Sequence, residues 1–156
     1  MQNIPISDVL TPAIQGFQDY WNERYGDSFA PSWRDIHLDE LDPKTIPYIV
    51  VADVKRNPLD FIIRFWGTEH VIRKGFDKTG ESIQQKLNFR GKVGWSEYVW
   101  VIENKKPMAS KGMVNLDDFG ELVPFEQSLV RFPLTNDGID VHHVISIAAW
   151  ADSRWE

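Results

Sequence analysis

The chain has 156 residues, of which 42% are hydrophobic and 26% are charged. This length and this balance are those of one globular domain with a continuous core, and they exclude a disordered or collagen-like chain. Cysteine is absent, which excludes a disulfide framework, a thiolate zinc site, an iron–sulfur cluster and a cysteine nucleophile.

Charge and hydropathy narrow the partners and the location that we expect. The formal net charge is −6 and the cations are scattered along the chain, so nucleic acid is disfavoured as a direct partner. Residues 1–15 lack the basic residues and apolar run of a secretory signal. No stretch approaches the roughly 20 apolar residues of a membrane span. We therefore expect a cytoplasmic protein that binds neither nucleic acid nor membrane.

The first periodic segment predicts an amphipathic helix over residues 12–25. Thr11 and Pro12 form an N-cap and first-turn pair, and Gly26 is a stop signal. An apolar stripe recurs at helical spacing, formed by Leu10, Ile14, Phe17 and Trp21. The stripe either packs on its own domain or forms an interface with a protein partner or with a second copy in a homodimer. We treat residues 1–30 as this helix and its lead-in, and residues 31–156 as the main folding unit.

The middle of the chain predicts a hairpin followed by two helices. Residues 48–54 and 61–66 are rich in β-branched and aromatic side chains, and the turn at 56–60 makes them an antiparallel pair. A short helix begins at Thr68 and ends before Gly75. A longer helix covers residues 91–104, with apolar side chains at three- and four-residue spacings.

The last third of the chain predicts three more strands, over residues 108–116, 124–134 and 141–149, with turns at 117–120 and 136–138. Hairpins this closely spaced require an antiparallel sheet, and helices segregated from the strands make the class α+β. The expected fold is a five-stranded antiparallel sheet with helices on one face and an extra N-terminal amphipathic helix.

This order of elements is the one seen in PAS domains, and short sequence landmarks strengthen the likeness. They are, in chain order, Pro31-Ser32-Trp33, Asp42-Pro43, Ile46-Pro47, Asp53-Val54, Phe61 to Arg64, Gly67-Thr68, Gly75 to Gly80, Lys106-Pro107 and Phe132 to Gly138. Spread over residues 32–149, they make the chain resemble a bacterial family of single PAS domains, of the type called PAS_5.

The resemblance implies a PAS-like domain in signal transduction, which senses a small molecule, binds a protein partner, or does both. It supplies no ligand and no catalytic residue, so the cofactor is unknown. Haem and covalent flavin are disfavoured, because the sequence has no cysteine or histidine motif of the sort that PAS domains use for them.

Candidate ligand-binding residues lie on the second predicted strand and on the helices after it. Trp66, Thr68, Trp95 and Tyr98 are expected to face one cavity, with large aromatic walls and two hydroxyl groups. The alternative is a packed core without a cavity, which an aromatic stripe at helical spacing also fits.

Two further candidates are ionisable. Arg64 either binds an anionic ligand or forms a structural ion pair with an acid such as Asp53 or Glu69. His143 either hydrogen-bonds a ligand from the inner surface of the last strand or is a satisfied core histidine. His142 falls on the opposite face by alternation, so the pair cannot hold one metal ion, and we predict no metal site.

No catalytic motif is present: the sequence has neither a Gly-x-Ser-x-Gly elbow, nor a phosphate-binding Gly-Lys-Ser loop, nor a His-Glu-x-x-His helix. We therefore predict a protein that is not an enzyme, with no catalytic residue. Two alternatives stay open. One is a ligand-free adaptor, and the other is a small cone-shaped isomerase in which Asp53 or Asp60 supplies a buried carboxylate.

Overall fold

The computed structural model describes residues 3–83, 89–114 and 125–150, and its elements follow the order expected from the sequence. The five strands are β1 (Ile49–Lys55), β2 (Asp60–Trp66), β3 (Met108–Val114), β4 (Phe125–Leu134) and β5 (His143–Trp150). They form one sheet in the order β2-β1-β5-β4-β3, and every neighbouring pair is antiparallel. The α+β class and the five-stranded antiparallel sheet are thus confirmed.

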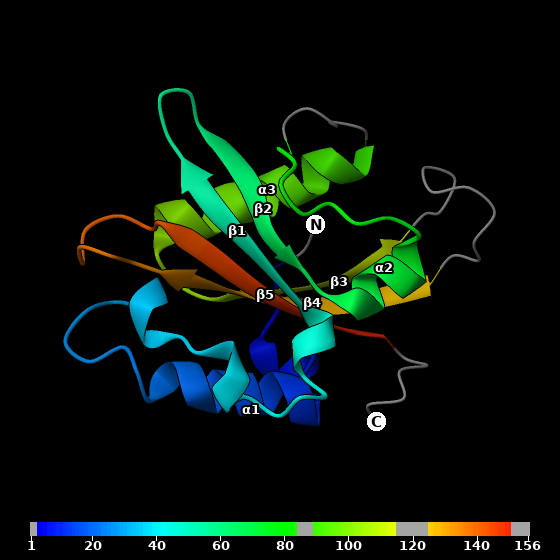
Figure 1. The fold of residues 1–156 in the computed structure, drawn as a ribbon, viewed down its shortest axis with the longest axis horizontal. Helices are drawn as coiled ribbons and strands as arrows, with labels where there is room; N and C mark the ends of the chain where they lie inside the picture. The colour runs from blue at the N-terminus through cyan, green and yellow to red at the C-terminus, as the bar shows by residue number, and fades with distance from the viewer. Residues whose placement is uncertain (1–2, 84–88, 115–124, 151–156) are drawn as a thin grey trace.

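Helices cover both faces of this sheet (Figure 1). The helices are α1 (Pro12–Asn22), α2 (Thr68–Lys74) and α3 (Phe89–Asn104). Short 3-10 helices lie before β1: η1 (Ile6–Asp8) precedes α1, and η2 (Trp33–Asp35), η3 (Leu38–Glu40) and η4 (Ile46–Tyr48) follow it. Alternate residues of the central strand β1 enter two different cores: Ile49 and Val51 pack with α1, whereas Val50 and Ala52 pack with α3. The extra N-terminal helix therefore covers the face opposite α3.

Helix α1 forms where the sequence predicts it, because its start is encoded locally. The backbone N–H of Ile14 donates to the hydroxyl oxygen of Thr11, and Pro12 occupies the first turn. The helix ends at Asn22, three residues earlier than predicted.

The apolar stripe of α1 packs on the chain's own sheet. Ile14, Phe17 and Trp21 are buried, and the indole N–H of Trp21 donates to the backbone oxygen of Pro133 at 3.0 Å. Leu10 precedes the helix and is 40% exposed. Of the two alternatives for the stripe, the structure has packing on its own domain and not an interface with a partner. Three of the four candidate interface residues are therefore unavailable to a partner while α1 stays on the sheet.

Helix α2 places a histidine and a lysine in the interior. The Nε2–H of His70 donates to the backbone oxygen of Tyr48 at 2.9 Å, and its Nδ1 lies 3.1 Å from the Nζ of Lys74 and accepts from it. Both side chains are buried. Burial and the neighbouring Lys74 charge lower the pKa of His70 well below its ordinary value.

The free energy of unfolding is expected to fall as the pH drops below about 6.5, the pKa of an unfolded histidine. His70 stays neutral in the folded protein while the unfolded chain binds the proton, so each pH unit below that value costs up to about 1.4 kcal/mol. Urea unfolding at pH 7.5 and pH 5.5 checks this, and His70→Gln should flatten the difference. A wild-type midpoint that is the same at both pH values would contradict the assignment. His143→Gln serves as a second variant, because the pKa of His143 is also lowered.

Candidate functional site

A bulge in strand β2 shapes the candidate site. Along the β1–β2 pair, Val51 lies opposite Phe65 but Ala52 lies opposite Ile63, so Arg64 is an extra residue in β2. The bulge breaks strict alternation and turns both Arg64 and Phe65 toward the α1 side of the sheet, where Phe65 packs against the α1 core. The sequence pattern instead placed Arg64 on the same face as Trp66.

Arg64 and His143 meet at one carboxylate. The Nε of Arg64 donates to Oδ1 of Asp53 at 2.7 Å, and Nδ1 of His143 lies 2.8 Å from the same oxygen. The side chains of Arg64, Asp53 and His143 are 46%, 23% and 11% exposed. Of the two alternatives for Arg64, the structure has the ion pair with Asp53, and it brings a second candidate residue to the same place.

The environment of His143 fixes one ring form. Desolvation by burial lowers the pKa of His143 and outweighs the opposing effect of Asp53, so the ring is neutral at pH 7. Because the Asp53 carboxylate only accepts, the proton of the neutral ring is on Nδ1. The indole of Trp33 lies over the imidazole with 5.6 Å between ring centroids.

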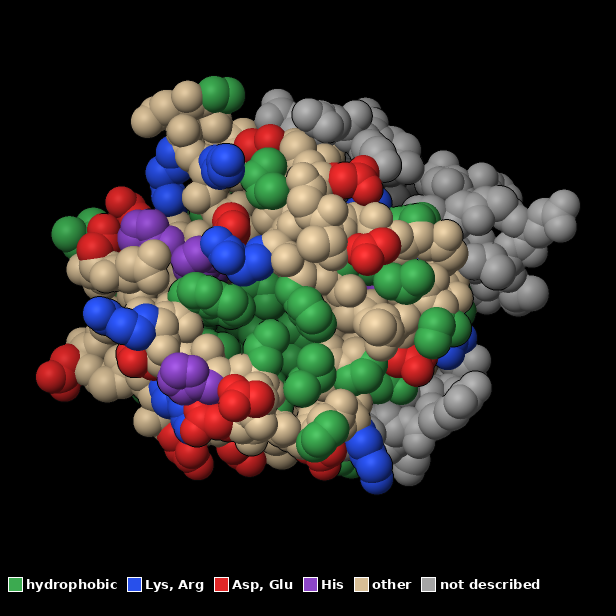
Figure 2. Space-filling view, in the orientation of Figure 1, with side chains coloured by type: hydrophobic (Ala, Val, Ile, Leu, Met, Phe, Trp, Pro, Cys, Tyr) green, Lys and Arg blue, Asp and Glu red, His purple; other side chains and the backbone are tan. Residues whose placement is uncertain are grey.

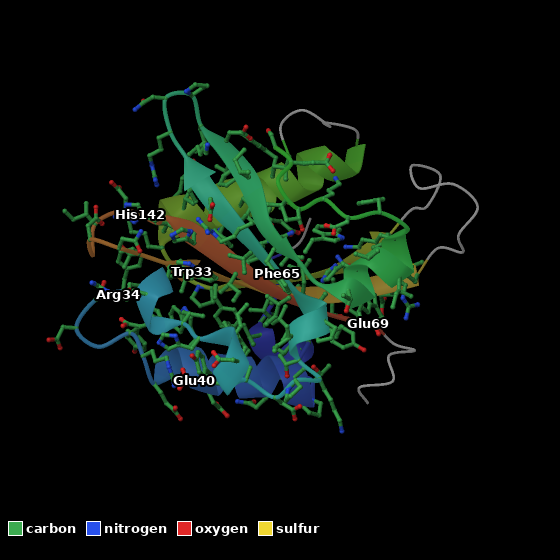
Figure 3. All side chains as sticks on the ribbon, viewed as in Figure 1. Trp33, Arg34, Glu40, Phe65, Glu69 and His142 are labelled. Atoms are coloured by element: carbon green, nitrogen blue, oxygen red, sulfur yellow. The ribbon has the colours of Figure 1, made fainter. Side chains whose placement is uncertain are left out.

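An apolar hollow lies beside this polar cluster. Figure 2 shows hydrophobic side chains lining a depression in this face, with basic, histidine and acidic side chains around it. Figure 3 shows Trp33, from η2, and Phe65, from β2, at this place. Both side chains are partly buried, as is Leu38 of η3, and all three pack against the α1 core. We call this depression the Trp33–Phe65 hollow.

The chemistry of the hollow is that of a small-molecule site. Such sites combine apolar walls with a few polar groups that fix the orientation of the ligand. Here the walls carry two aromatic rings, and the rim carries a guanidinium, a carboxylate and an imidazole. Trp33 and Phe65 were not predicted as site residues, because neither has a sequence pattern that distinguishes a hollow from a core.

The remaining candidate residues lie elsewhere. Trp95 and Tyr98 of α3 both pack on Phe61, each with its ring centroid 5.0 Å from the Phe61 ring, which is the packed-core alternative. Trp66 belongs to the same side of the sheet, and its indole N–H donates to the backbone oxygen of Phe76 at 3.0 Å. Thr68 is exposed at the start of α2. The four residues therefore do not face one cavity: Trp66, Trp95 and Tyr98 make core contacts, and Thr68 lies at the surface.

A buried ion pair under α3 was missed altogether. Glu97 accepts from the Nε of Arg131 at 2.8 Å, and the Nη1 of Arg131 donates to the Ser146 hydroxyl at 2.8 Å. The Arg131 guanidinium lies 4.3 Å from the Tyr98 ring centroid. Burial lowers the pKa of Arg131, but Tyr98 and Glu97 outweigh it, so the net shift is upward and the guanidinium is charged. Arg131 of β4 thus ties Glu97 of α3 to Ser146 of β5.

Asp53 and Asp60 are the candidate carboxylates of the isomerase alternative, and both have partners in the structure. Asp60 accepts from the Ser82 hydroxyl and from the backbone N–H of Phe61, so it has structural partners, as Asp53 has. Among residues 3–83, 89–114 and 125–150, no three histidine, aspartate or glutamate side chains gather closely enough for a metal ion. Within the same ranges, no helix has the length and apolarity to cross a membrane.

Comparison with known proteins gives a distant likeness to a solved structure. No family model and no curated protein matches the chain. Among solved structures, the chain is similar to a fungal LOV domain photoreceptor at 14% sequence identity and a TM-score of 0.49. The match covers 93% of this chain and 98% of that chain.

Proposed function

We propose that this chain is a PAS-like sensor domain that binds a small organic molecule in the Trp33–Phe65 hollow. The observation that carries the proposal is an apolar hollow (Figure 2) whose Trp33 ring lies 5.7 Å from the Arg64 guanidinium carbon and 5.6 Å from the His143 ring. Fold class alone supports no particular function. The sensory role is supported instead by the resemblance of the sequence landmarks to single PAS domains.

The position of the hollow suits a ligand that changes the state of the domain. Its walls come from two separate parts of the chain: Trp33 belongs to the segment that follows α1, and Phe65 belongs to the sheet. A ligand between them contacts both parts at once, so its binding energy can favour one packing of that segment on the sheet over another. A protein partner that binds the surface of this segment then distinguishes the two packings.

Trp33→Ala or Phe65→Ala is expected to weaken binding of a neutral apolar probe, N-phenyl-1-naphthylamine, by about tenfold or more, because each removes one aromatic wall. Fluorescence titration of wild type and variants measures the dissociation constants. Ile72→Ala is the matched control, because Ile72 is an apolar side chain that is 70% exposed on α2, and its loss should leave binding unchanged. Urea unfolding of each variant establishes that it is folded.

Two outcomes oppose the proposal. If wild type does not bind the probe, the ligand-free adaptor becomes the better interpretation. If all three variants bind as wild type does, the probe occupies another surface and the hollow is not the site.

A further inference from the structure

We propose that the Trp33–Phe65 hollow takes an organic anion, whose acidic group binds the Arg64 guanidinium while its apolar body lies between Trp33 and Phe65. This inference rests on the proposed function and adds the chemical class of the ligand.

Arg64 keeps unused donors at the rim. Its Nε is bonded to Asp53, and within the described parts of the chain its two Nη nitrogens have no hydrogen-bond partner. The side chain is 46% exposed, and its guanidinium carbon lies 5.7 Å from the Trp33 ring centroid. The free donors are thus held beside the apolar wall instead of in bulk solvent. A planar pair of N–H groups fits the two oxygens of a carboxylate or of a sulfonate.

Asp53 makes the guanidinium a fixed binding group. An arginine that is free in solvent loses side-chain freedom when it binds an anion, and that loss opposes binding. Here the 2.7 Å contact with Asp53 has already ordered the side chain. The same oxygen of Asp53 also accepts from His143, which keeps the carboxylate in place without adding a charge, because the ring is neutral at pH 7.

Arg64 supplies cationic donors at the hollow although the whole chain carries a net charge of −6. Arg34 is exposed and follows Trp33 in the chain, and it lies on the side of Trp33 away from Phe65 (Figure 3). Glu40 of η3 is already paired: its carboxylate accepts from the Tyr20 hydroxyl and lies 3.7 Å from the Arg24 guanidinium. The cationic donors beside Trp33 are therefore those of Arg64, whose Nε is paired with Asp53.

The test compares two probes of nearly the same shape that differ in charge. The anionic probe is 1-anilinonaphthalene-8-sulfonate, and the neutral probe is N-phenyl-1-naphthylamine. Wild type is expected to bind the anion more tightly, and Arg64→Gln should weaken its binding about tenfold while changing that of the neutral probe less than twofold. Arg64→Lys keeps the charge and should recover part of the loss. The matched control is Lys111→Gln, since Lys111 is equally exposed at 46% and is also paired with a carboxylate, that of Glu126.

The outcomes separate this inference from the proposed function. If the neutral probe requires Trp33 and Phe65 but Arg64→Gln leaves the anionic probe unchanged, the hollow is a ligand site and the anion assignment is wrong. If Lys111→Gln weakens the anionic probe as much as Arg64→Gln does, the effect is one of net charge and the assignment is again wrong. If neither probe requires the aromatic walls, the proposed function itself fails.

Discussion

Glu97→Leu is expected to lower the free energy of unfolding by about 3 to 5 kcal/mol, because it leaves a buried charge without its counter-ion. The side chains of Glu97 and Arg131 are only 4% and 10% exposed, so water cannot replace the lost carboxylate. The Ser146 hydroxyl and the Tyr98 ring remain as partners of Arg131, but neither carries a negative charge. Urea unfolding, followed by far-UV circular dichroism, measures the loss.

The double variant Glu97→Leu/Arg131→Met distinguishes a lost charge balance from simple loss of packing. Replacing both charges with apolar side chains of similar size removes the unpaired ion, and such replacements are often neutral or stabilising. The double variant should therefore recover most of the stability that Glu97→Leu loses. The comparison pair is Lys111 and Glu126, whose surface contact at 3.6 Å is expected to be worth less than about 1 kcal/mol.

A loss from Glu97→Leu no larger than that from Lys111→Gln would mean that the buried pair is not held as the structure shows it. Failure of the double variant to recover stability would instead assign the loss to packing under α3. Probe binding at the Trp33–Phe65 hollow is a useful second readout, because the hollow lies on the α1 side of the sheet and the ion pair lies on the α3 side. If it is folded, the Glu97→Leu/Arg131→Met double variant should bind the neutral probe with the same dissociation constant as wild type.

The elements that sequence alone predicted well are those whose signals are local. The cap at Thr11, the stop at Gly75 and the hairpin formed by β1 and β2 each depend on residues a few positions apart. The faces of the elements were harder to assign. The sequence of the α1 stripe is compatible with packing on its own sheet and with binding a partner, and only the completed fold shows which surface covers it.

The candidate site depends on the bulge in β2, which strict alternation of side chains along a strand does not predict. Strict alternation along β2 put Arg64 on the face of Trp66, whereas the bulge opposite Val51 and Ala52 puts Arg64 beside Phe65 and Asp53. A bulge adds one residue to one strand, so it becomes visible only when the partner strand is aligned. The sequence allows Asp53 as the ion-pair partner of Arg64, but it does not indicate that the same carboxylate also accepts from His143, 90 positions away.

The buried ion pair had a weaker signal that was available. Arg131 stands in the apolar run from Leu129 to Leu134, and a charged residue inside a buried strand requires a partner. Glu97 lies 34 residues away on α3. Sequence could therefore predict that Arg131 has a buried partner, but not which acid supplies it.

Gly67→Ala is expected to cost about 3 kcal/mol or more of the free energy of unfolding, because the added methyl group would meet backbone atoms. Gly67 has an ordinary φ of −60°, so its conformation suits any residue. Its requirement is one of space: a Cβ would lie 2.2 Å from the backbone oxygen of Pro47 and 2.8 Å from that of Ile49. The N–H of Gly67 also donates to the Ile49 oxygen at 2.8 Å, so this junction cannot open without losing a hydrogen bond.

Gly16→Ala is the matched control. Gly16 lies inside α1, where a Cβ would have no atom within 4 Å. Alanine there should raise the free energy of unfolding by about 0.5 to 1 kcal/mol, because it restricts the unfolded chain and favours the helix. The two substitutions add the same methyl group and should shift the urea midpoint in opposite directions. If Gly67→Ala is as well tolerated as Gly16→Ala, then η4 does not lie against the start of α2 as closely as the structure places it. The Tyr48–His70 hydrogen bond, and with it the expected pH dependence, would then also be in doubt.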